Sequence, residues 1–238
     1  MSIPPKLVLI IAEAALETVP KSLWRHPSVQ RHSERRGKPP KFLLLDRSYH
    51  HTAMRKLKDG EKRGRPDIVH FSLLEALDSP LNREGLLEVY VHTVQDFVIW
   101  VNPKVRLPRN YNRFVGLIEQ LFQLGRVPPS GPVLLRLERK TLSRLLDEVQ
   151  PSRVVAFTRE GRPETLEEAM ARLSGERRPT VLVGGFPHGS FSEETLKLAD
   201  RMVCIDPETL DAWTVTSRLV YEYERAISLP TRRLRRVS

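Results

Sequence analysis

One stretch of the chain carries arginines at both of its ends, and these are the residues best suited to recognising a ligand. Its first end, RGRPD, holds Arg63, Arg65 and Asp67 around a glycine and a proline. Its far end holds three arginines spaced three and four residues apart: Arg106, Arg109 and Arg113. Guanidinium groups bind phosphate oxygens in a fixed two-pronged geometry. The spacing therefore predicts a site for a polyanion.

The net charge supports an anionic partner. The chain has 238 residues, with 39 basic and 29 acidic side chains and a formal charge of +10. A surplus of this size favours nucleic acid or an anionic membrane surface, although it can also serve solubility alone. A membrane-surface protein would need a basic amphipathic helix with an apolar face, and the sequence offers none. Nucleic acid is therefore the favoured partner, and no membrane contact is expected.

A glycine-rich loop late in the chain is the second candidate site. Gly184, Gly185 and Gly189 belong to GGFPHG, which follows the apolar run TVLV. The loop has no lysine followed by serine or threonine, so it is not a phosphate-binding P-loop, and it does not match GxGxxG. The first apolar run, LVLIIAEA, has no glycine, which argues against an ordinary dinucleotide or methyl-transfer fold. The pattern predicts a cofactor site near the C-terminus, with a tight turn that binds nothing as the alternative.

A second loop lies beside the first in the expected sheet. CIDPETLDAW follows the next apolar run and leads into the last helix. Two loops at the ends of neighbouring strands form a crevice in which nucleoside-like ligands bind. Trp213 lies in this loop, although a lone tryptophan is more often part of the core. We expect the two loops to form one crevice.

The elements that position these residues follow an alternating pattern, which predicts an α/β fold with a mostly parallel sheet. Expected strands are Leu7–Ala12, Phe42–Asp46, Leu86–Thr93, Phe97–Asn102, Arg153–Thr158, Thr180–Val183 and Met202–Ile205. Expected helices are Ala14–Val19, a short segment from Ser48, Asp67–Leu77, Arg113–Leu124, Leu142–Val149, Glu164–Leu173, Glu193–Leu198 and Leu210–Ile227. The basic segment Trp24–Pro40 is expected to be a surface loop or irregular helix, and the basic tail from Thr231 is expected to be frayed.

Other reactive residues point to no further chemistry. Cys204 is the single cysteine, which excludes a disulfide within the chain and indicates a reducing, cytoplasmic compartment. His50 and His51 are adjacent and point in different directions, and no cysteine or carboxylate spacing accompanies them, so no metal is expected. The sequence also has no Gly-x-Ser-x-Gly motif and no serine-histidine-aspartate pattern of a hydrolase.

Several stretches, taken in order, resemble one family of enzymes. They are FLLLDRSYHHTAMRKL, RGRPDIVHFSLLEALDSPLN, VYVHT, VNPKVRLPRNYNRFVGLIEQL, VGGFPHG and DAWTV. They look like the SPOUT class of methyltransferases and, more narrowly, the ribosome-biogenesis family that methylates N1 of a pseudouridine in small-subunit ribosomal RNA. The resemblance covers most of the chain and leaves out the segment Trp24–Pro40 and the tail from Thr231.

The resemblance implies a fold and a set of partners. Residues 1–238 would form a single SPOUT domain with a family-specific insertion and a C-terminal trefoil knot, an exception to the rule that chains are unknotted. S-adenosyl-L-methionine would bind in the knot, held largely by backbone groups. The protein would be a homodimer that binds a hairpin of small-subunit rRNA, with ribosomal proteins or assembly factors as further conceivable partners.

The same resemblance assigns roles to individual residues. The cofactor would lie against the loops Phe157–Thr158, Val183–Gly189 and Cys204–Trp213. Within them the expected contacts are Phe157, Thr158, Val183, Gly184, Gly185, Gly189, Cys204, Ile205, Leu210, Ala212 and Trp213. The RNA-contacting residues would be Arg65, Arg106, Arg109 and Arg113.

The chemistry leaves one acid as the catalytic candidate. N1 of pseudouridine carries a proton that must leave during methylation, and Asp67 beside Arg65 could accept it. Asp67 could equally be a helix cap or the partner of a nearby arginine. Tyr111, among the arginines, could stack on a base or be buried. The alternative function is a non-catalytic ribosome-assembly factor that binds rRNA as a chaperone.

Overall fold

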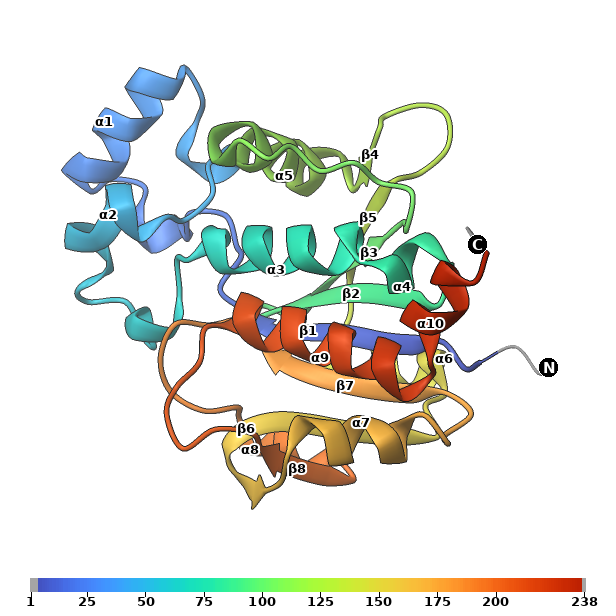
Figure 1. Ribbon diagram of the computed structural model, residues 1–238. Helices are drawn as coiled ribbons and strands as arrows, with labels where there is room; N and C mark the ends of the chain where they lie inside the picture. The colour runs from blue at the N-terminus through green and yellow to red at the C-terminus, as the bar shows by residue number, and fades with distance from the viewer. Residues whose placement is uncertain (1–3, 237–238) are drawn as a thin grey trace.

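The computed structural model describes residues 4–236 and is built on one eight-stranded sheet (Figure 1). The strands lie in the order β4-β5-β3-β2-β1-β7-β6-β8. They are β1 (Leu7–Ala14), β2 (Leu87–Thr93), β3 (Phe97–Val101), β4 (Arg126–Val127), β5 (Leu135–Arg139), β6 (Arg153–Pro163), β7 (Pro179–Gly184) and β8 (Arg201–Cys204). Strands β2, β1, β7, β6 and β8 pair in parallel. Strands β3, β5 and β4 add an antiparallel edge beside β2. The expected α/β class with a mostly parallel sheet is confirmed.

Helices cover both faces of this sheet. The α-helices are α1 (Pro27–Arg36), α2 (Arg47–Met54), α3 (Pro66–Asp78), α4 (Pro80–Arg83), α5 (Tyr111–Leu124), α6 (Leu142–Val149), α7 (Leu166–Leu173), α8 (Glu193–Lys197), α9 (Ala212–Ala226) and α10 (Leu229–Leu234). Three short 3-10 helices are η1 (Lys21–Leu23), η2 (Pro40–Phe42) and η3 (Gly60–Lys62). No helix within residues 4–236 is long and apolar enough to cross a membrane.

Strand β1 forms the middle of the core, and all eight of its residues are buried. Successive side chains of a strand point to opposite faces. Leu9 and Ile11 accordingly belong to the larger core, which they share with residues of α3, α5, α7 and α9. Val8 and Ile10 belong to a second core with residues of α6. Figure 1 shows α3 and α9 lying side by side over the first of these faces. A strand buried on both faces explains the continuous apolar run in the sequence.

Two expected elements next to β1 are wrong. Residues Ala14–Val19 do not form a helix, because β1 continues to Ala14 and the chain then stays extended. Phe42–Asp46 is not a strand of the sheet, and only one isolated bridge joins Leu44 to Thr18. Leu43 and Leu45 are instead buried in a separate small core that includes residues of α1 and α2. An apolar run of this length satisfies either environment, so its pattern could not decide between them.

The two basic segments are more regular than expected. Residues 24–40 contain the helix α1, which has Pro27 at its first position and ends at Gly37 in the left-handed conformation. The tail from Thr231 is not frayed at its start, because Leu229–Leu234 forms α10. Arg233 and Arg236 each donate to the carboxylate of Glu84, at 3.0 and 2.9 Å.

A buried pair of histidines joins α1 to α2. His50 Nδ1 accepts a hydrogen bond from the backbone N–H of Asp46 at 3.1 Å. Nε2 of the neutral ring therefore carries the proton and donates to His32 Nδ1, 2.9 Å away. Burial, followed by the charge of His32, lowers the pKa of His50 to about 4, and burial also lowers the pKa of His32. The pair is therefore neutral at pH 7.

This pair predicts that the protein loses stability in mild acid. An unfolded histidine binds a proton near pH 6.5, whereas folded His50 stays neutral down to about pH 4, so stability rises with pH across this window. The contribution is about 3 kcal/mol, because each pKa unit between about 6.5 and about 4 is worth about 1.4 kcal/mol. The measurement is the urea midpoint from pH 4 to pH 8. The variant His50→Asn, which keeps an acceptor for the Asp46 N–H, should show a shallower rise, and an unchanged slope would contradict the assignment.

Candidate functional site

A cavity of about 390 Å³ opens at the ends of β7 and β8 and beside Phe157–Arg159, where β6 stops pairing with β7. The carboxyl ends of parallel strands are the usual place for a ligand in an α/β fold. Nine of the eleven residues expected to contact a cofactor line it: Phe157, Thr158, Val183, Gly184, Gly189, Ile205, Leu210, Ala212 and Trp213. The loops after β7 and β8 thus meet at one place, as the sequence predicts. Phe157 and Thr158 are not in a loop, because β6 continues past the expected strand end at Thr158 to Pro163.

Gly185 and Cys204 do not line this cavity. The backbone N–H of Gly185 donates to Ala12 O at 2.8 Å, and its carbonyl accepts from Ala15 N–H at 2.8 Å. A Cβ at Gly185 would lie 2.7 Å from Ile11 Cγ2 and 2.8 Å from the Cα of Ala14. The glycine is therefore needed for contact with β1. Cys204 is half-buried, and its thiol lies 3.2 Å from the carbonyl of Asp206.

The cavity combines aromatic surface with acidic groups. Phe157 and Trp213 supply ring faces, and Trp213 packs edge-on against Phe71 of α3 at 5.3 Å between ring centroids. Three carboxylates also line it: Asp206, Glu208 and Asp211. Its volume lies within the range usual for small-molecule sites. Rings, backbone groups and carboxylates together fit a nucleoside that carries positive charge, such as a sulfonium compound.

Some lining residues lie beyond the three expected loops. They are Ile68, Arg159, Ser190, Phe191, Val203 and Val215. Ser190 and Phe191 only prolong the glycine loop, so its length was underestimated. Ile68 comes from α3 and is far away in sequence, and its place in an apolar helix pattern gave no sign that it would reach a cavity.

Arg65 and Asp67 lie at the start of α3 and bind each other. Arg65 Nε lies 2.8 Å from Asp67 Oδ1, and Arg65 Nη2 lies 2.7 Å from Oδ2. The hydrogen bond that Arg65 donates to Asp67 is the first cause of the raised pKa of Arg65. Arg65 also lines the cavity. Asp67 is thus the partner of a nearby arginine, which was one of the three roles considered for it.

The other arginines lie on a separate surface. Residues 103–110, here called the arginine loop, lie between β3 and α5. His70 Nε2 donates to Pro108 O at 2.7 Å, and Asn82 Nδ2 donates to Pro103 O at 2.9 Å, so α3 and α4 hold the loop in place. Arg106 and Arg109 line a groove of about 1330 Å³ between this loop and helices α3, α4 and α9. Within one chain the four arginines therefore do not share a cavity.

The arginines also differ in what they bind. Arg63 is paired with Glu17 at 2.5 Å, as Arg65 is with Asp67. Within residues 4–236, no ion pair involves the three remaining arginines, which are exposed: Arg106, Arg109 and Arg113. Their guanidinium groups are available to an anionic ligand.

Tyr111 lies among these arginines in the sequence, but its hydroxyl group binds a residue of another segment. Its hydroxyl donates to Asp46 Oδ2 at 2.5 Å. Burial, followed by this hydrogen bond, raises the pKa of Tyr111 above its ordinary value. The tyrosine is half-buried and ties α5 to the start of α2.

Comparison with known proteins decides the family. Residues 9–224 match the model of the EMG1/NEP1 methyltransferase family. The chain belongs to this family. It is 47% identical over 218 residues to the ribosomal RNA small subunit methyltransferase Nep1 of Thermococcus onnurineus, covering 92% of this chain and 98% of that protein. It is 48% identical over 226 residues to the protein of the same name from Thermococcus kodakarensis, covering 94% and 100%.

A solved structure agrees with this result. The crystal structure of Archaeoglobus fulgidus Nep1 bound to S-adenosylhomocysteine superposes with a TM-score of 0.82 at 42% identity, covering 95% of this chain and 100% of that one. The family resemblance expected from the sequence is therefore confirmed.

The close approach of Gly185 to β1 gives a prediction about stability. Gly185→Ala should lower the free energy of unfolding by about 2 kcal/mol, because the added methyl group meets the backbone of Ala14. Gly116, inside α5, has open space around it, so Gly116→Ala should raise stability by about 0.5 to 1 kcal/mol. Urea unfolding of both variants provides the measurement. Equal effects of the two substitutions would show that Gly185 is not packed as described.

Proposed function

We propose that the protein uses S-adenosyl-L-methionine to methylate N1 of a pseudouridine in small-subunit ribosomal RNA, as a step of ribosome biogenesis. The observation that carries this proposal is the cavity at the ends of β7 and β8, beside the middle of β6, in a chain of the EMG1/NEP1 methyltransferase family. A Nep1 of known structure binds S-adenosylhomocysteine, the product that remains after methyl transfer.

The residues of the cavity suit the cofactor. S-adenosylmethionine, when bound, supplies an electrophilic methyl group on a sulfonium cation. Asp206, Glu208 and Asp211 offer negative charge to the cationic groups of such a ligand. Phe157 and Trp213 offer rings against which an adenine can pack. A phosphate-binding loop rich in lysine would repel this ligand, and the glycine loop has no lysine.

Asp67 is the proposed proton acceptor. As the N1–C bond forms, N1 of pseudouridine loses its proton, which a carboxylate at this place can take up. Two hydrogen bonds from Arg65, which lines the cavity, fix the orientation of Asp67, which does not line the cavity itself. Much of the remaining rate would come from holding the methyl group and N1 in line.

The RNA would be bound by Arg65 together with Arg106, Arg109 and Arg113. The target base must leave its stack to enter the cavity, at a cost of a few kcal/mol. A hairpin loop lowers this cost because its bases are already unstacked. The absence of ion pairs at the last three arginines supports a role in gripping phosphates.

We further propose a homodimer with a knotted C-terminus. Phe71 of α3 and Tyr221 of α9 are 43% and 55% exposed on adjacent helices, which suits a protein interface. The chain also returns from the edge strand β8 to place α9 over the middle of the sheet, as threading would require. Residues 1–238 would then be one domain, acting in the cytoplasm. A monomer mass in light scattering would contradict the dimer.

The direct test uses two RNA hairpins that differ only at the target base. The protein should add one methyl group to a hairpin containing pseudouridine and none to the same hairpin containing uridine, whose ring presents a glycosidic bond at N1. Mass spectrometry of the digested RNA provides the measurement. Asp67→Asn should lower the rate by about 10²-fold to 10⁴-fold while S-adenosylhomocysteine still binds. A non-catalytic RNA-binding assembly factor would methylate neither hairpin and need not bind the cofactor.

A second prediction concerns RNA affinity. Replacing both Arg109 and Arg113 by alanine should weaken hairpin binding and make it less sensitive to salt. Each lost phosphate contact should reduce the slope of log K against log salt by about 0.7 to 0.9. Gel-shift titrations at several salt concentrations provide the measurement, and calorimetry with S-adenosylhomocysteine is the control. Unchanged RNA affinity would exclude these arginines from the interface.

A further inference from the structure

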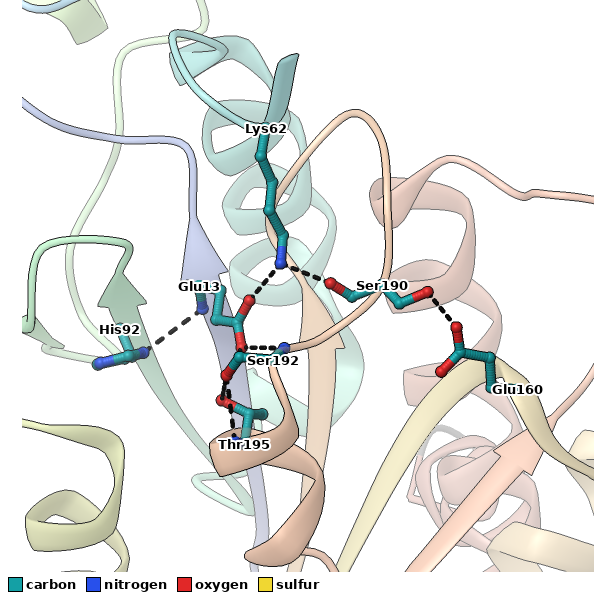
Figure 2. Close-up of polar contacts among 7 residues, drawn as sticks. All are labelled: Glu13, Lys62, His92, Glu160, Ser190, Ser192 and Thr195. Atoms are coloured by element: carbon teal, nitrogen blue, oxygen red, sulfur yellow. Dashed lines mark hydrogen bonds and ion pairs between the residues drawn. The ribbon is translucent and has the colours of Figure 1, made fainter. Parts of the chain in front are cut away.

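The loop that walls the cavity is held at both ends by β1. This loop, residues 184–192 and here called the cofactor loop, begins with the backbone bonds of Gly185 to Ala12 and Ala15. At its other end, the N–H and Oγ of Ser192 donate to Glu13 Oε1 at 2.8 and 2.7 Å. Figure 2 shows this carboxylate between Ser192 and the side chain of Lys62.

Lys62, which lies outside the sheet, contacts both the cofactor loop and Glu13. Its Nζ lies 2.6 Å from Glu13 Oε2 and also donates to the carbonyl of Ser190 (Figure 2). The same ammonium group lies 4.2 Å from the ring centroid of Phe186, a favourable cation–π contact. Ser190 and Phe186 both line the cavity. Every contact of this ammonium group is thus to the cofactor loop or to the residue that anchors it.

The environment of Glu13 favours its ion pair with Lys62. Its side chain is 10% exposed, and that of Lys62 is 21% exposed. Burial raises the pKa of Glu13, but hydrogen bonds from Lys62, Thr195 and Ser192 outweigh this effect and leave the pKa below its ordinary value. The pair therefore stays charged at neutral pH. A buried carboxylate that loses its partner is strongly unfavourable, so the loop and Lys62 depend on each other.

Lys62 also belongs to the segment that carries Arg65. The N–H of Arg65 donates to Ala15 O at 3.1 Å, and Ala15 N–H donates to Gly185 O. Arg63, between them in sequence, binds Glu17 and not the cofactor loop. Residues 62–65 thus touch the cofactor loop through Lys62 and line the cavity through Arg65.

We propose that Lys62 is a positioning residue that couples the cofactor loop to the RNA-binding segment, so that each ligand strengthens the binding of the other. The proposal rests on the function proposed above. When the cofactor orders residues 184–192, the ammonium group of Lys62 is fixed by Glu13 and Ser190, and Arg65 is fixed three residues further on. Coupling of this kind is reciprocal and is typically 5-fold to 150-fold in affinity.

The test is calorimetry with S-adenosylhomocysteine, with and without a pseudouridine-containing hairpin. The unmodified protein should bind S-adenosylhomocysteine at least 5-fold more tightly when the hairpin is present. Lys62→Gln should weaken binding about tenfold and abolish the effect of the hairpin. Lys62→Arg, which keeps the charge and the donors, should restore much of both. Arg63→Met is the matched control, because it removes the neighbouring ion pair to Glu17 but no contact of the cofactor loop, and it should keep the coupling.

Each outcome decides the matter. Thermal melts show whether Lys62→Gln is folded, and Ser192→Ala serves as a second variant because it loosens the same loop without removing a charge. Ser192→Ala should weaken S-adenosylhomocysteine binding severalfold. Unchanged coupling in Lys62→Gln, or an equal loss in Arg63→Met, would overturn the role of Lys62 and leave the proposed function intact. Failure of the unmodified protein to bind S-adenosylhomocysteine or the hairpin would overturn the proposed function, and the role of Lys62 with it.

Discussion

The end of β1 and the non-helical residues that follow it, residues 12–17, hold the parts of the site together. Because residues 12–17 are not helical, their backbone groups are free to bond with other segments. Ala12 and Ala15 bond Gly185 of the cofactor loop, and Ala15 also accepts from Arg65. Ala14 accepts from Val94, which follows β2. A helix in this place would use these groups internally, and the loops would lose their common support.

The basic side chains near the site fall into two groups. Some are paired with carboxylates and stabilise the structure, and the others are unpaired and can contact a ligand. Lys62 and Arg63 are close in sequence to Arg65, and all three are paired with carboxylates. Those carboxylates lie at the end of β1 or at the start of α3. The arginine loop contains no comparable pair, and its support comes from His70 and Asn82 through the loop backbone. The loop is therefore fixed without using its arginine side chains, which keeps them open to phosphate.

The sequence predicted helices and strands well where a periodic apolar pattern was compatible with only one type of element. The helices α3 and α5 carry apolar residues at helical spacing, and Gly125 in the left-handed conformation ends α5 close to the expected residue, Leu124. The pattern failed where a second core exists, because Leu43 and Leu45 pack against α1 and α2 and not in the sheet. This second core could not be recognised from the sequence, because α1 is polar and only two of its residues, Val29 and His32, are buried.

Site residues were predictable where the position of a loop in the sheet shows that it faces a ligand. Nine of the contacts that the family resemblance assigned line the cavity, and most of them follow β7 and β8, parallel strands that end at the same edge. Gly185 was the less predictable case. A glycine allows either a ligand or a backbone to come close, and only the structure shows that the neighbour is Ala14. Lys62 gave no signal at all, because a lysine in a polar loop is usually solvated.

The two cavities lie at opposite ends of the same pair of helices. The first turns of α3 and α9 reach the smaller cavity through Ile68 and Ala212, and their later turns reach the groove through Leu74 and Tyr221. The helices therefore run in the same direction. A two-fold axis that crosses them would reverse this direction in the partner and bring the groove of one copy near the smaller cavity of the other. In the homodimer proposed above, the unpaired arginines would approach the smaller cavity from the second chain, and this arrangement would account for their separation from Arg65 within one chain.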